Sequence, residues 1–308
     1  MSDPVLVAGA TGKQGGAAAR ALRAAGTPVR ALVRDPGSAA ARALAGLGVE
    51  VVRGDLDDPA SVVAAARGAR GVFSVQMPDL EDLLGDREIR HARAIAAAVR
   101  ETGVEQVVHT SVSGAGEHGR PGAVDPELWG AHMAHYWPSK LAAEEIVTGA
   151  GAGRTTVLRP STFMENFVPP SMYLAGGDSA EFAVPLDADV EHPFVAVDDI
   201  GAAAAAAFTD PDRFDGVALE LAGERLTFRQ AVRTIGEAWG TEITVTDDPE
   251  AARASGLPEA FLRSFAFLGT YQAPAAPEDA RRFGLPTTSL ATWARSHPQT
   301  LRPAVAHR

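Results

Sequence analysis

The chain has 308 residues, of which 46% are hydrophobic and 22% are charged, and its formal net charge is −11. This length exceeds a typical domain of about 100–150 residues, so we expect a second, smaller lobe. The absence of cysteine excludes disulfides and thiolate chemistry. The acidic balance argues against nucleic-acid binding, and no apolar run approaches the roughly 20 residues that a membrane span needs.

The first half of the chain alternates short apolar runs with helical patterns. Strands are expected at 5–8, 29–33, 49–52, 71–75, 104–109 and 155–158, with helices over 17–25, after Asp58-Pro59 and over 88–100. Strands that alternate with helices predict an α/β fold with a parallel, doubly wound, Rossmann-type sheet. Because the first strand begins at Val5 and cysteine is absent, we expect no signal peptide and a cytoplasmic protein.

The second half is less regular. Residues 160–193 are expected to be rich in loops, and Asp198-Asp199 to cap a helix over 200–208. A strand over 217–221, a capping box from Thr227 to Gln230, a strand over 242–246 and helices over 258–268 and near Leu290 follow. We predict a Rossmann domain over 1–160 and a smaller α+β lobe over 161–308, with about 190–222 returning to the first domain.

The first strand runs into a glycine-rich turn that opens a helix. Such a turn binds the pyrophosphate of a dinucleotide: one glycine makes the turn tight, one lets the backbone approach the phosphates, and one lets the helix pack on the strand. The helix N-terminus presents free N–H groups to the phosphate charge. The residues expected to hold the pyrophosphate are Gly9, Thr11, Gly12, Gln14 and Gly15.

The end of the second strand distinguishes NADP from NAD. Arg34 follows Val33 directly, and a guanidinium there suits the 2′-phosphate of NADP(H), with Lys13 adding a second positive charge. Asp55, after the third strand, is compatible with an adenine contact or with capping the next helix. Gln76 and Met77, after the fourth strand, are expected near the nicotinamide.

Tyr136 and Lys140 are the candidate catalytic pair. On a helix they share one face, and a neighbouring ammonium lowers the pKa of a phenol. Such a tyrosine can exchange a proton with a substrate oxygen while hydride moves to or from a nicotinamide. The alternative is a packing tyrosine beside a surface ion pair between Lys140 and Glu144.

These residues resemble the short-chain dehydrogenase/reductase superfamily, and more narrowly its NmrA-like branch of isoflavone-reductase-type enzymes, quinone reductases and redox-sensing regulators. The resemblance implies NADP(H) binding and a Rossmann-type fold, and it covers enzymes as well as sensors. The matching pieces are Gly9–Gly16, Val33–Pro36, Gly54–Asp58, Ser139-Lys140 with Glu144, Leu158–Pro160, Phe163–Phe167 and Val197–Ile200.

Two departures from this pattern concern the catalytic tyrosine. The branch often lacks this residue, whereas this chain has Tyr136, which favours catalysis. Pro138 lies between Tyr136 and Lys140, and it predicts that Tyr136 sits just outside the helix, off the face of the lysine. By analogy with the superfamily the active hydroxyl belongs to Ser113, with Ser111 as the alternative. Asn166 is expected to touch substrate or nicotinamide by resemblance only.

Aromatic residues gather in the segments expected to cover the nicotinamide. Trp137, Phe163 and Phe167 are predicted to line an apolar substrate pocket with Asn166. His118, His132 and His135 complete no familiar ligand pattern, so no metal site is predicted.

The pattern as a whole predicts an NADPH-dependent reductase of a small apolar or aromatic carbonyl, enone or quinone. A non-catalytic NADP(H)-binding sensor and an epimerase or dehydratase that recycles its nicotinamide are the alternatives. A homodimer is expected only because dimers are the commonest soluble oligomers.

Overall fold

The computed structural model describes residues 3–171, 173–254, 256–257, 259–268, 271 and 273–304. Its centre is a seven-stranded sheet with the strand order β10-β6-β5-β4-β1-β2-β3, and every pair of neighbours is parallel. The strands are β1 (Val5–Val7), β2 (Val29–Val33), β3 (Glu50–Arg53), β4 (Gly71–Val75), β5 (Gln106–Thr110), β6 (Arg154–Pro160) and β10 (Val217–Leu221).

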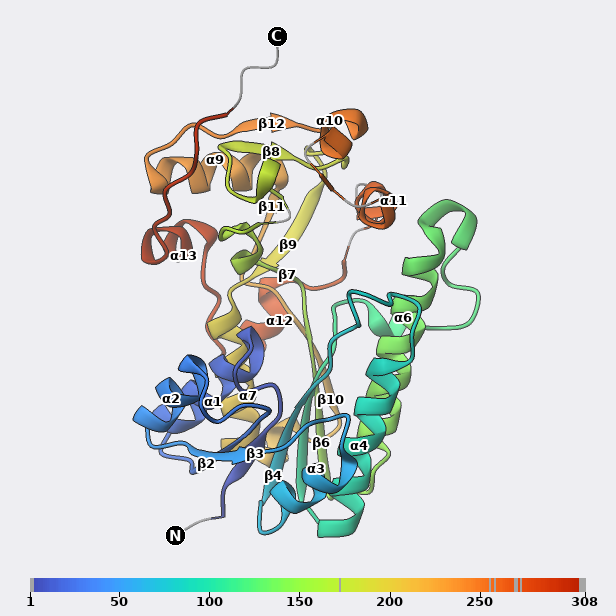
Figure 1. Cartoon of the computed structure of the whole chain (residues 1–308), viewed down its shortest axis with the longest axis vertical. Coiled ribbons are helices and arrows are strands. Elements are labelled where there is room, and N and C mark those ends of the chain that lie inside the picture. Colours follow the sequence, from blue (N-terminus) through green and yellow to red (C-terminus); the bar gives the residue numbers. More distant parts are fainter. Residues whose placement is uncertain are drawn as a thin grey trace.

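Helices cover both faces of this sheet, as a doubly wound fold requires. In Figure 1 the helices α1, α2 and α7 lie on one side of the sheet and α3, α4 and α6 on the other. The first group is α1 (Lys13–Ala24), α2 (Ala39–Gly46) and α7 (Val197–Thr209), and the second is α3 (Pro59–Ala66), α4 (Arg87–Thr102) and α6 (Pro126–Thr148). The predicted α/β class and the parallel sheet are confirmed.

The smaller lobe lies at the carboxyl ends of the strands and has its own core of aromatic side chains. Two small sheets build it: β11-β9-β7 and β12-β8. Its strands are β7 (Thr162–Phe163), β8 (Glu181–Ala183), β9 (Glu191–Val195), β11 (Glu224–Thr227) and β12 (Thr244–Thr246). Its helices are η1 (Met164–Phe167), η2 (Ala175–Gly177), α9 (Phe228–Trp239), α10 (Pro249–Ala254), α11 (Glu259–Leu268) and α13 (Leu290–Ser296).

The chain crosses between the two lobes more than once. After β9 it returns to the large sheet through α7, α8 (Pro211–Phe214) and β10, and only then continues into β11. Short helices α5 (Ala115–His118) and α12 (Pro277–Arg282) complete the described elements. The division of the chain into domains at residue 160 stays a prediction. The segments that return to the large sheet, α7 and β10, lie within the range 190–222 expected to do so.

Three local expectations are wrong. The first helix starts at Lys13 rather than 17, directly from the glycine turn. The Asp198-Asp199 pair does not cap α7; its N-cap is Ala196, and the Glu165 carboxylate accepts the Val197 N–H at 3.1 Å. Tyr136 lies inside α6, which continues through Pro138, and the break in helical geometry falls at Gly130 instead. The predicted capping box from Thr227 to Gln230 is confirmed.

Candidate functional site: two adjoining clefts

The turn between β1 and α1 requires its glycines. Gly9 has a φ of +62°, and a Cβ on it would lie 2.7 Å from the Val75 side chain. A Cβ on Gly15 would lie 2.3 Å from the carbonyl oxygen of Gly9, so only glycine lets α1 begin this close to β1. Gly12 is the N-cap and supplies no side-chain cap, which leaves the first N–H groups of α1 for a ligand.

A cleft of about 560 Å³ opens along this turn at the carboxyl ends of β1, β2 and β4. It brings together most of the residues that the sequence singles out for cofactor binding. The predicted cofactor-binding residues on its walls are Gly9, Thr11, Gly12, Lys13, Gln14, Gly15, Arg34, Asp55 and Met77. Phe163 and Asn166, which were predicted for the substrate pocket, also lie there. We call this space the glycine-turn cleft.

Lys13 and Arg34, the two cations predicted to bind phosphate, both line the glycine-turn cleft. The Lys13 ammonium donates to the backbone oxygen of Glu165 at 3.2 Å and to the Asn166 side chain at 3.4 Å, which ties the turn to η1. Arg34 is exposed, and its guanidinium has no hydrogen-bond or ion-pair partner within the described ranges. Arg34 is therefore the cation that remains available to an anion.

The structure decides between the two roles considered for Asp55. Asp58 caps α3 by accepting the Ser61 N–H, whereas the Asp55 carboxylate accepts the Asp57 N–H at 3.1 Å and lies on the cleft wall. The capping role is therefore wrong, and the adenine contact stays a prediction.

Arg87 and His91 of α4 also line the cleft and were not predicted. The only feature of the sequence that could have indicated them is that a helix is expected to begin soon after the fourth strand, close to the carboxyl end of the sheet.

Lys140 is buried next to the glycine-turn cleft and is held from two sides. Its ammonium donates to the backbone oxygen of Gln76 at 3.2 Å and forms an ion pair with Glu88 of α4. The predicted alternative, a surface pair with Glu144, is wrong: Glu144 accepts both arms of the Arg159 guanidinium, at 2.7 and 3.1 Å. Glu88 was not predicted, because only the packing of α4 on α6 brings it to Lys140.

Tyr136 lies beside Lys140, with the ammonium 5.4 Å from the centre of its ring. Burial raises the pKa of the Tyr136 phenol, and Glu88 adds to that rise, while Lys140 acts in the opposite direction. Lys140 therefore acts in the expected direction, but burial outweighs it and the net shift of the pKa is upward, so the expectation of a lowered Tyr136 pKa is wrong. The phenol keeps its proton at neutral pH.

The two candidate serines have different surroundings. Ser113 accepts the Ala275 N–H at 3.3 Å and hydrogen-bonds to Glu220, so its hydroxyl is already engaged. Ser111 is buried, and its hydroxyl has no hydrogen-bond partner in the described part of the chain. Side chains alternate along an extended chain, so Ser111 shares a face with His109, whose pKa burial and the nearby Lys140 lower to about 3.

Gln76 lies behind Lys140 rather than on the cleft wall. Its side-chain nitrogen donates to the Ser74 hydroxyl at 2.8 Å, and Ser74 is 3.2 Å from Nδ1 of His109. All three side chains are buried. Together they form a rigid polar support for the backbone oxygen that holds Lys140.

A second, apolar cleft of about 250 Å³ adjoins the first and shares Pro78 with it. Tyr136 and Trp137 of α6 form part of its wall, together with Pro78, Leu80, Leu83, Val112, His132, Met133, Phe261, Ser264, Phe265 and Leu268. Of the predicted pocket residues, Trp137 lies here and Phe163 and Asn166 line the glycine-turn cleft. Phe167 lies in the core of the smaller lobe, 1% exposed, against Phe194 and Phe228.

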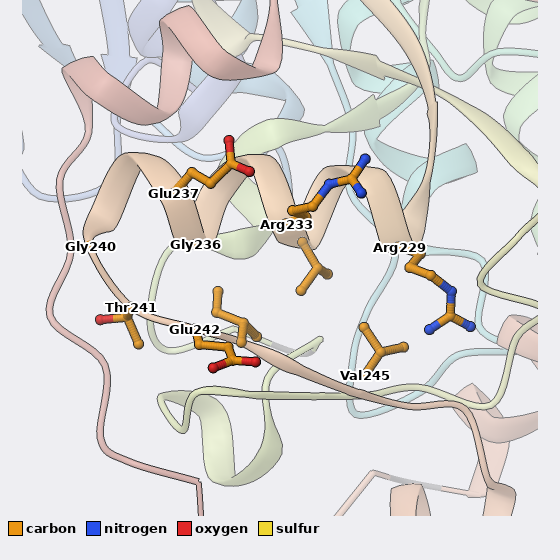
Figure 2. Close-up of a pocket in the computed structure, with 10 residues that line it drawn as sticks. Arg229, Arg233, Gly236, Glu237, Gly240, Thr241, Glu242 and Val245 are labelled. Carbon is orange, nitrogen blue, oxygen red and sulfur yellow. The ribbon is translucent and has the colours of Figure 1, made fainter.

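A third hollow, of about 470 Å³, lies between α9 and the segment that leads into β12. Figure 2 shows Arg233 and Glu237 directed away from this segment, and Arg229 at one end. Arg229 is already paired with Asp189 at 2.9 Å. Because it lies in the smaller lobe away from the glycine turn (Figure 1), this hollow is separate from the candidate site.

With this geometry described, comparison with known proteins identifies the family. The chain belongs to the NmrA-like family, whose pattern matches residues 1–275. An oxidoreductase of that family from Malbranchea aurantiaca, malD, is 29% identical over 253 residues, which cover 77% of this chain and 73% of that protein.

Two solved structures share the fold over almost the whole chain. Triphenylmethane reductase from Citrobacter sp., complexed with NADP(H), has a TM-score of 0.74 at 21% identity and covers 96% of this chain and 100% of that one. The negative transcriptional regulator NmrA, in complex with NADP, has a TM-score of 0.72 at 20% identity and covers 96% and 95%. No described helix has the length and apolar character that crossing a bilayer would demand.

Proposed function

We propose that this chain is an NADPH-dependent reductase of a small apolar or aromatic carbonyl, enone or quinone. The observation that carries the proposal is the junction of the two clefts: Tyr136 forms part of the apolar wall while Lys140, one turn away, is fixed beside the glycine-turn cleft. A proton donor, a ribose-binding cation and an apolar space then meet at one place.

The residues of the glycine-turn cleft fit NADP(H). The uncapped start of α1 and the glycines that allow close approach suit a pyrophosphate. Arg34, which is exposed and unpaired among the described side chains, suits the additional 2′-phosphate, because a guanidinium donates to phosphate through two parallel hydrogen bonds. The NADP(H) complex of the structurally similar reductase supports the same assignment.

Lys140 has one ammonium proton left after Gln76 and Glu88, which suits a hydroxyl of the nicotinamide ribose. When bound, NADPH supplies the hydride. The Tyr136 phenol gives its proton to the substrate oxygen as the neighbouring carbon is reduced, and regains a proton from water. Of the two serines, Ser111 has the hydroxyl that is not already engaged, so it is the one proposed to donate a hydrogen bond to that oxygen.

The substrate class follows from the wall of the second cleft. Its lining is aliphatic and aromatic, with His132 and Ser264 as polar members that already face each other at 3.2 Å. Such a space favours a compact apolar molecule. Among the described side chains of its wall, no unpaired cation is available to bind a negatively charged substrate. A reductase role is also supported by malD, because this similar protein of the same family is named an oxidoreductase.

The proposal is tested by following NADPH oxidation against a panel of quinones, enones and aromatic ketones. Tyr136→Phe should lower kcat by about 10²–10⁴-fold, the usual contribution of general acid catalysis, while the Kd for NADPH stays unchanged. Unchanged turnover in this variant would rule out Tyr136 as the donor. No turnover with any substrate, together with tight NADPH binding, would favour an NADP(H) sensor such as the structurally similar regulator.

A further inference from the structure

A buried ion pair joins α4 to α6 behind the candidate catalytic tyrosine. The side chains of Glu88 and Lys140 are only 6% and 9% exposed. Taking two charges out of water costs several kcal/mol per ion, so such a pair is a weak source of stability. Its position beside Tyr136 suggests a different role.

The pair is the dominant charge that acts on Tyr136. Of the other titratable groups nearby, His132 lies with its ring 6.1 Å from that of Tyr136, and burial lowers its pKa. His109, close to Lys140, is neutral with a pKa of about 3. Glu144 is compensated by Arg159. The α11 residues that line the apolar cleft with Tyr136 carry no charge: Phe261, Ser264, Phe265 and Leu268.

We propose that Glu88 is a positioning residue: it fixes the Lys140 ammonium and cancels its positive charge toward Tyr136, so that the site keeps a protonated phenol. A lone ammonium at this distance would favour the phenolate, because opposite charges attract. Because the Glu88 carboxylate is paired with the ammonium, the pair is neutral overall, and the burial that disfavours the phenolate decides the outcome.

The consequence is a preferred direction of reaction. A phenol that holds its proton can donate to a substrate oxygen during reduction, whereas oxidation of an alcohol needs the phenolate as a base. This consequence depends on the proposed function. The ionisation itself depends only on the geometry of Glu88, Lys140 and Tyr136, so it is tested without turnover.

The chain has three tyrosines, which makes the ionisation of Tyr136 measurable by the ultraviolet absorbance of tyrosinate. Burial raises the pKa of Tyr173 to about 12 and raises that of Tyr271 further. The part of the absorbance change that is lost in Tyr136→Phe therefore assigns the ionisation of Tyr136.

Glu88→Gln should lower the midpoint of this titration by on the order of one pH unit, because the Lys140 charge is no longer compensated. The double variant Glu88→Gln/Lys140→Arg keeps a positive charge at every pH and should show the same fall. Glu88→Gln/Lys140→Met removes both charges and should titrate no lower than the wild type. Glu101→Gln, at an exposed position on the same helix, is the matched control and should leave the midpoint unchanged.

A cooperative thermal unfolding transition, measured for each variant, shows that the variant is folded before it is heated. A midpoint that stays at the wild-type value in both Glu88→Gln and Glu88→Gln/Lys140→Arg would overturn the proposal. Should both fail to fold, the wild type still decides: nuclear magnetic resonance of ring-labelled tyrosine should place the Tyr136 midpoint above the ordinary value of about 10, and a lower midpoint overturns the proposal. Absence of NADPH oxidation would count against the reductase alone.

Discussion

Arg34 is the cation whose loss should change cofactor preference. It is exposed on the cleft wall at the end of β2, and a charge-assisted bond to phosphate contributes about 1.5–3 kcal/mol. Arg34→Ser should therefore raise the Kd for NADPH by about tenfold or more and leave the Kd for NADH nearly unchanged. Isothermal titration calorimetry with both cofactors measures this difference.

The matched control is Arg100→Ser, which removes the same charge from an exposed position in the last turn of α4. It should alter neither affinity by more than a factor of two or so, since surface changes away from a site are worth within about 0.5 kcal/mol. An equal loss of NADPH and NADH affinity in Arg34→Ser would show that Arg34 does not distinguish the two cofactors.

At the scale of residues, the sequence predicted the cofactor-binding residues that lie on one short motif. The glycine turn, Lys13 and Arg34 follow from a strand, a turn and a strand end, which are local features. Glu88 could not be predicted in the same way, because its role depends on how α4 packs against α6. The shift of the Tyr136 pKa was predicted with the wrong sign because burial, which raises this pKa most, and the Glu88 carboxylate, which adds to the rise, both depend on tertiary packing.

Among the elements, α7 shows a cap that comes from elsewhere in the chain. Both carboxylate oxygens of Glu165 lie 3.1 Å from the Val197 nitrogen, and Oε1 also accepts from the Trp293 indole at 2.9 Å. This single side chain therefore connects η1, α7 and α13. The neighbouring acidic pair at 198 and 199 misled the prediction, since its position in the first helical turn imitates a cap.

Glu165→Ala should lower the free energy of unfolding by about 1–3 kcal/mol, because it leaves two buried N–H donors without an acceptor. Chemical denaturation of the variant measures this loss. Asp198→Ala removes a carboxylate whose partner is the exposed Arg20, and should change stability by less than about 0.5 kcal/mol. If Asp198→Ala costs as much as Glu165→Ala, the acidic pair and not Glu165 supports the helix start.

Across the whole molecule, buried histidines link stability to pH. Burial lowers the pKa of His192, in the aromatic core, to about 4, and that of His109 to about 3. Because these folded-state pKa values lie below the ordinary 6.5, the unfolded chain binds more protons as pH falls. Their contribution to stability is therefore complete above about pH 6.5 and decreases as the pH falls toward 4.

His192→Leu isolates this effect, because it removes one titrating group and fills a similar volume. The free energy of unfolding of the wild type should fall relative to that of His192→Leu by about 3 kcal/mol between pH 7 and pH 4, the equivalent of a shift of roughly 2.5 pKa units. Urea denaturation at several pH values gives both curves. Parallel curves would show that His192 is not buried in its neutral form.

The parallel sheet was predictable at the scale of the molecule, because its strands are apolar runs separated by helical patterns. The small sheets were predictable only in part. The expected strand over 242–246 contains β12, but β7 and β8 are two or three residues long, and the pairing within these sheets joins segments far apart in the chain. Residues 160–193 were expected to be mostly loops for this reason. Their order comes from the aromatic core that they share with α9.

The return of the chain to the large sheet has a consequence for dividing this protein. The edge strand β10 and the helix α7, which packs along α1 with Gly201 against the Ala17 backbone, both follow the first strands of the smaller lobe. A fragment that stops after β6 would expose the alanine-rich face of α1 and the rim of its sheet. No single cut therefore separates the chain into one piece with the complete large sheet and another with the complete smaller lobe.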